Sequence, residues 1–161
     1  MNVQPSRFYP DGMMEPQLSV ILYRRMMLTA GFREREHTAD WELEAWAPDF
    51  PSLLEQAARG MYTLMGTHME TGPRRARDLA LPCADLETCL VAFLSELLFI
   101  NETEGLAFDA YSFQMDGLVL HAHLEGAAIV SQTKEIKAVT YHNLSIRQTE
   151  RGMEVSIVFD V

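Results

Sequence analysis

The chain has 161 residues, a length that suits one domain or two very small ones. Apolar residues make up 48% and charged residues 22%, the balance of a globular protein that folds without cross-links. The chain has 13 Lys and Arg but 23 Asp and Glu, which gives a net charge of −10. This charge argues against tight, direct RNA or DNA binding, and it suits a basic protein partner or a cation.

Residues 1–32 differ from the rest of the chain. Pro5, Pro10 and Pro16 break any periodicity there. The largely apolar run over residues 18–23 is far shorter than the ~20 residues that span a bilayer, and it precedes its arginines, whereas a signal peptide places its charges first. We therefore expect a poorly ordered extension over residues 1–32, a single domain over residues 33–161, and a cytoplasmic protein.

The first elements of the domain follow from periodicity. Residues 41–47 alternate between apolar and polar side chains, which predicts a half-buried strand. Residues 52–65 carry apolar side chains at helical spacing. Either Ser52 or Asp49 can serve as the N-cap, and Glu55 would complete a capping box with Ser52.

The second half of the domain contains one more helix and several strands. Residues 78–81 suggest a short strand, and Asp85 is the expected N-cap of a largely covered helix over residues 86–100. An Asp-Gly pair at 116–117 predicts a hairpin turn. Strands are expected over residues 107–115, 118–124, 136–146 and 154–161. Because hairpins dominate over βαβ alternation, the fold class is α+β, with two helices packed on an antiparallel or mixed sheet.

Two cysteines, Cys83 and Cys89, have neither the spacing of a disulfide framework nor a second pair to form a zinc site. We expect two reduced and largely buried thiols. The chain also lacks the nucleophile elbow, the zinc-protease motif and the glycine-rich phosphate loops.

Three segments could carry chemistry. Asp40 ends the sequence His-Thr-Ala-Asp, where it either forms local turn contacts or points toward a site. Lys137 lies among apolar residues of the predicted 136–146 strand, where it either reaches water at an edge or meets a carboxylate. Asp160 and the terminal carboxylate of Val161 are one residue apart, and such oxygens are the ligands that hard cations require.

His121 and His123 should share one face of a strand, because they are two residues apart. That pair could bind a transition metal, but no third ligand is identifiable, so an exposed strand face is the simpler interpretation.

Taken in chain order, several segments resemble the archease family over about residues 32–161. They are H-T-A-D before the first strand, L-L-E-Q-A-A-R-G-M-Y in the first helix, S-E-L-L-F-I in the second, the segment E-I-K-A-V-T-Y-H, and the closing V-F-D-V. The resemblance implies an α+β unit built from strand-helix-strand-strand modules.

It also implies a function. Archeases assist the GTP-dependent RNA ligase that joins 2′,3′-cyclic phosphate or 3′-phosphate ends to 5′-hydroxyl ends in tRNA splicing and RNA repair. They promote guanylylation of the ligase's active-site histidine and allow the ligase to turn over many times. By resemblance, Asp40, Asp160 and Val161 bind a divalent cation, usually calcium, although Mg²⁺ or Mn²⁺ would also suit the oxygens. Lys137 is similarly placed to matter for ligase activation.

The expected role is that of a non-catalytic activator whose protein partner is the ligase, with no membrane. Two alternatives use the same residues differently. The chain could be a metal-dependent phosphohydrolase, although it lacks a clear second metal set or general base. It could also be a protein-interaction module that is indifferent to metal.

Overall fold

The computed structural model describes residues 30–35 and 40–161 and contains two helices and nine strands within them. The expected extension therefore lies, up to residue 29, outside the described residues, as do His37, Thr38 and Ala39. Gly31 and Phe32 already belong to a strand. Within the described part, no helix is both long enough and apolar enough to cross a membrane.

The first sheet has five strands, in the order β1-β2-β9-β7 with β8 also paired to β9. All of its pairings are antiparallel. Its strands are β1 (Gly31–Arg35), β2 (Trp41–Ala47), β7 (Ala138–Val139), β8 (Arg147–Thr149) and β9 (Gly152–Asp160). The alternation predicted for β2 is confirmed, since Leu43, Ala45 and Ala47 are buried while the residues between them are only partly buried.

The second sheet has four antiparallel strands with β6 at its centre. Its members are β3 (His68–Met69), β4 (Arg75–Pro82), β5 (Leu106–Asp116) and β6 (Val119–Ser131). The predicted hairpin joins β5 to β6, and Gly117 takes the positive φ of 59° that the two-residue turn requires. The expected strands here are present, each longer than predicted.

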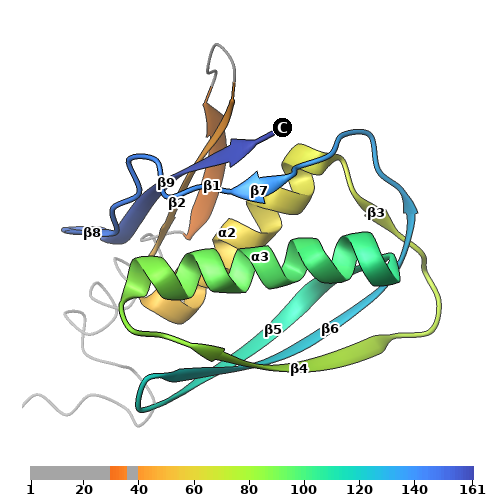
Figure 1. Cartoon of the computed structure of the whole chain (residues 1–161), viewed down its shortest axis with the longest axis horizontal. Coiled ribbons are helices and arrows are strands. Elements are labelled where there is room, and N and C mark those ends of the chain that lie inside the picture. Colours follow the sequence, from red (N-terminus) through yellow and green to blue (C-terminus); the bar gives the residue numbers. More distant parts are fainter. Residues whose placement is uncertain (1–29, 36–39) are drawn as a thin grey trace, which may run out of the picture.

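Helices α2 (Phe50–Met65) and α3 (Leu86–Glu104) contact both sheets and lie between them (Figure 1). The Asp49 side chain caps α2 by accepting the Ser52 amide at 2.8 Å, so Ser52 is inside the helix and no capping box forms. Asp85 caps α3 through the Thr88 amide at 2.7 Å, as predicted. Leu53, Leu54, Met61, Phe93 and Leu97 are fully buried between the layers.

The strand predicted over residues 136–146 is wrong for most of its length. Only Ala138 and Val139 form β7, and a turn follows at residues 142–143, where Asn143 adopts a positive φ of 53°. Buried residues in this segment are three apart, at Ile136 and Val139, so the predicted two-residue alternation of faces does not hold. The side chain of Asn tolerates the left-handed conformation, which permits the turn that follows β7.

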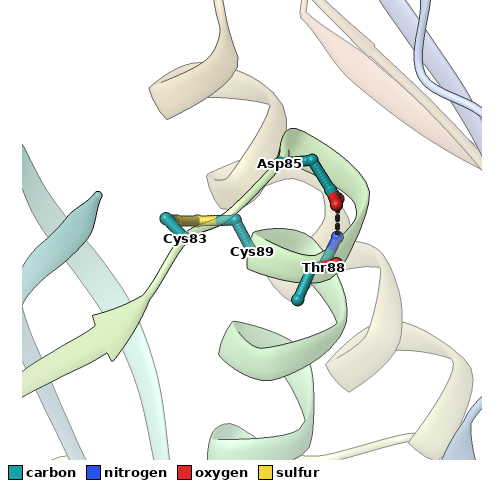
Figure 2. The surroundings of a disulfide bond; sticks show 4 residues. All are labelled: Cys83, Asp85, Thr88 and Cys89. Atoms are coloured by element: carbon teal, nitrogen blue, oxygen red, sulfur yellow. Dashed lines mark hydrogen bonds between the residues drawn. A yellow bond between two sulfur atoms is a disulfide. The ribbon is translucent and has the colours of Figure 1, made fainter. Parts of the chain in front are cut away.

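The cysteines are buried as expected, but they are not reduced. A disulfide joins Cys83, directly after β4, to Cys89, in the first turn of α3, with their Cα atoms 4.5 Å apart (Figure 2). Sequence spacing missed this pair because the cap at Asp85 reverses the chain between the two residues and brings them together.

Candidate metal centre

The predicted site residues belong to one end of the five-stranded sheet, where β2 begins and β9 ends. Strand β9 lies between β2 and β7, and Trp41 pairs with Phe159. Asp40 directly precedes β2 and Asp160 is the last residue of β9, so the same antiparallel register, continued by one residue, would set the two opposite each other. Cross-strand neighbours have Cα atoms about 4.5–5.5 Å apart and point to the same face, so we expect these two carboxylates, 120 positions apart in the chain, to lie near each other.

Strand β7 brings Lys137 to the other side of β9. Ala138 pairs with Asp160, and the Lys137 amide donates to the Asp160 carbonyl at 2.8 Å. The Lys137 ammonium donates to the main-chain oxygen of Val161 at 3.1 Å. Lys137 therefore contacts both final residues of the chain, and it is exposed at the edge of the sheet, as the first of its two predicted settings requires.

The burial of β9 explains why this end of the sheet is well defined. Phe159 and Ile157 are fully buried, and Val161 packs against the core. Asp160 is exposed, and Asp40 is partly buried. Buried neighbours thus hold the main chain in place, while the two carboxylates stay in reach of solvent and of a ligand.

Donor chemistry decides whether these residues fit a hard divalent cation. Carboxylate and main-chain oxygens are the ligands such cations prefer, and two aspartates with one main-chain oxygen provide a partial set that water completes. Among residues 30–35 and 40–161, no three His, Cys, Asp or Glu side chains form a group that could hold a metal. The fit therefore depends on main-chain oxygens as well as side chains.

Lys134 is a neighbour of the site that the sequence did not single out. Its ammonium lies 4.5 Å from the centre of the Trp41 ring, next to Asp40 in the chain. A cation over an indole face is a favourable contact. The amino-acid composition could have drawn attention to Lys134, because Lys134 and Lys137 are the only lysines among the 161 residues.

His121 and His123 lie elsewhere, facing out from β6 as predicted. The Nδ1 atom of His123 is 2.6 Å from Asp78, and its Nε2 atom is 3.5 Å from Glu125. Hydrogen bonds to Asp78 and then Glu125 raise the pKa of His123 above its usual value, because both carboxylates favour the protonated ring. The imidazole of His123 is thus part of an exposed cluster of charged side chains.

Comparison with known proteins places the chain in a family. A model of the Archease protein family (MTH1598/TM1083) matches residues 32–161. Protein archease of Thermococcus gammatolerans is 30% identical over 125 residues, which cover 73% of this chain and 88% of that protein. Protein archease of Thermococcus kodakarensis is 29% identical with the same coverage.

Solved structures agree. The solution structure of Protein 1598 of Methanobacterium thermoautotrophicum has a TM-score of 0.64 and 25% identity, and the match covers 81% of this chain and 99% of that one. The crystal structure of an archease from Thermotoga maritima, described as a possible chaperone, shares the fold, with a TM-score of 0.61, 23% identity and coverage of 80% and 96%. The α+β prediction is confirmed, and the chain belongs to the archease family.

Proposed function

We propose that this protein is a non-catalytic activator of a GTP-dependent RNA ligase, acting in the cytoplasm on RNA repair or tRNA splicing. The observation that carries the proposal is the contact of Lys137 with Asp160 and Val161 at the end of the sheet where β2 begins, directly after Asp40. Membership of the archease family supports the same role. The acidic surface, with a net charge of −10, suits a protein partner better than RNA itself.

In this proposal, Asp40, Asp160 and the main-chain oxygen of Val161 hold a divalent cation, for which calcium is the first candidate and Mg²⁺ or Mn²⁺ the others. When bound, the cation supplies positive charge of the kind that helps position phosphate oxygens in nucleotidyl transfer. The two aspartates fix its place on the sheet, and their exposure leaves it open to a partner protein.

Lys137 has a different role from the aspartates. Its amide and its ammonium both bond to the end of β9, so it orders the segment that carries Asp160 and Val161. An ammonium here also adds positive charge where an approaching phosphate would benefit from it. We therefore assign Lys137 to ligase activation and not to metal binding.

Transfer of labelled GMP from GTP to the ligase histidine tests the proposal. Wild-type protein with calcium should accelerate labelling of the host's ligase, and Asp40→Asn with Asp160→Asn should abolish the acceleration. Equal acceleration by the double variant would contradict the proposed site. Incubation of the protein alone with GTP and Mn²⁺ should give no turnover, whereas hydrolysis without ligase would favour a phosphohydrolase.

A further inference from the structure

An open cavity of about 800 Å³ adjoins the candidate metal centre. One flank of α3 forms one wall, with Leu98 and Phe99, and the segment 132–139, which includes β7, forms the other. Lys137 lines this cavity and also contacts Val161, so it connects the cavity to the metal centre. Figure 1 shows β7 at the border of its sheet, alongside α3.

The wall next to β7 has backbone groups without partners. The Lys134 amide donates to Met65 and the Lys137 amide donates to Asp160, but Glu135 and Ile136, between them, make no backbone–backbone hydrogen bond with another described residue. Ile136 is only 5% exposed. Backbone groups of buried residues are nearly always paired, so Ile136 requires a partner that the described residues do not supply, whereas Glu135 is exposed and its backbone groups are open to solvent or to a ligand.

The strand itself is also open on this side. Strand β7 pairs with β9 through one edge, and no strand of the described residues pairs with its other edge. A groove between a helix and a free strand edge is the geometry in which an extended peptide adds to a sheet. Main-chain hydrogen bonds then give affinity, and side-chain pockets give selectivity.

The helix wall offers an anchor point. Phe99 is 58% exposed although it is aromatic, and Leu98 beside it packs against the core. Interfaces are centred on such apolar residues. The chain's two lysines both line the groove, and neither forms an ion pair with a carboxylate side chain among the described residues.

We propose that the groove between α3 and β7 binds an extended segment of the partner ligase, which adds as a strand beside residues 135–138. The segment places an apolar side chain against Phe99 and a carboxylate toward Lys134. The identity of the partner rests on the proposed function, whereas the mode of binding rests on the unpaired backbone and the exposed aromatic ring. Docking here would hold the metal centre against the ligase.

A free nucleotide is a poorer occupant of the same cavity. Glu102 and Glu135 line it together with the two lysines, so the wall has no excess of positive charge to neutralise a phosphate chain. A peptide with both apolar and acidic side chains matches the mixed wall better.

The test combines binding with amide hydrogen exchange, using the full chain and the host's ligase. The variant Phe99→Asp should weaken ligase binding by about tenfold or more. The control Leu118→Asp, at the tip of the β5–β6 hairpin, where Leu118 is 69% exposed, should bind within about twofold of wild type. Both variants should bind calcium and unfold like wild type.

In the complex, exchange of the Glu135 or Ile136 amide should slow by about tenfold or more, because an added strand pairs it. If wild type binds the ligase but Phe99→Asp binds equally well, or if neither amide slows, the groove is not the docking site and the proposed function stands. If wild type does not bind the ligase at all, the proposed function fails and the assigned occupant fails with it.

Discussion

At the scale of single residues, Asp40 and Asp160 have different surroundings but a shared position. Asp160 ends a strand whose neighbours Phe159 and Ile157 are fully buried, while Asp40 precedes the partly buried Trp41. The register of β2 and β9, continued by one residue, would place the two carboxylates on one face. Two carboxylates in such a position would repel each other, and a cation between them would relieve that repulsion.

Replacing either aspartate should reduce metal affinity. We expect Asp40→Asn and Asp160→Asn each to weaken calcium binding by roughly tenfold or more, because each removes a charged ligand. Calorimetric titration measures this. The matched control is Asp116→Asn, an exposed carboxylate at the far hairpin, which should bind like wild type. Unchanged affinity in both site variants would show that the cation is bound elsewhere or not at all.

Lys137 should separate activation from metal binding. We expect Lys137→Gln to bind calcium at least as tightly as wild type, because a positive charge beside the site is lost. Stimulation of the ligase should nevertheless fall. Titration and a ligation assay on the same preparation give both quantities. Loss of calcium binding together with stimulation would instead make Lys137 a support of the metal site.

At the scale of elements, residue patterns predicted the helices and strands that have clear periodicity, including α2, α3, β2 and the β5–β6 hairpin. They failed where a contact from elsewhere decides the conformation. The segment after Val139 has strand-forming residues, yet it turns at Asn143, and the Glu87 side chain accepts the Ile146 amide at 2.9 Å. No local pattern reveals a bond to a residue 59 positions away.

The candidate site shows the same division. Asp40, Asp160 and Lys137 were named from the sequence through resemblance to a family, but nothing local in the sequence shows that they meet. The contact of Lys137 with Asp160, and the approach of Asp40 from the other side, depend on β9 lying between β2 and β7, which is a property of sheet order. The contact of Lys134 with Trp41 and the unpaired backbone of residues 135–136 likewise depend on how the chain folds, and no local pattern in the sequence indicates them.

The cap of α3 predicts a specific dependence on pH. Hydrogen bonds from Thr88, first from its amide, lower the pKa of Asp85 below its ordinary value of 3.8. A carboxylate with a lowered folded pKa stabilises the protein above its unfolded pKa, and this contribution is lost as the pH falls through the folded value. Asn is about as good an N-cap residue as Asp, but its side chain carries no carboxyl group that titrates.

The difference in denaturation midpoint between wild type and Asp85→Asn should therefore shrink or change sign as the pH falls from about 5 to about 3. Urea unfolding across that range, at constant ionic strength, measures it. A difference that stays constant with pH would show that the charge on Asp85 does not contribute to the cap.

The disulfide between Cys83 and Cys89 makes a prediction of its own. Closing a loop of this size stabilises the folded state by about 2 kcal/mol in the chain-entropy model. Cys89→Ala with Cys83→Ala, or treatment with a reductant, should lower the free energy of unfolding by about that amount. Denaturant unfolding measures the change, and mass spectrometry counts free thiols. Two free thiols in protein purified under air would contradict the disulfide.

At the scale of the whole molecule, two antiparallel sheets enclose two helices (Figure 1), and the candidate site residues belong to one end of the first sheet. The candidate metal centre and the groove between α3 and β7 share Lys137, so they form one continuous surface. A partner that docks in the groove would have the two aspartates beside it. This arrangement suits an accessory protein that presents a cation to another enzyme.

The most direct test of this account is a multiple-turnover ligation assay with the host's ligase, GTP, calcium, and RNA bearing 3′-phosphate and 5′-hydroxyl ends. Wild-type protein at substoichiometric concentration should increase the number of RNA molecules joined per ligase well beyond one, and Asp160→Asn should leave it near the value for ligase alone. Equal stimulation by Asp160→Asn, or no stimulation by wild type, would contradict the account.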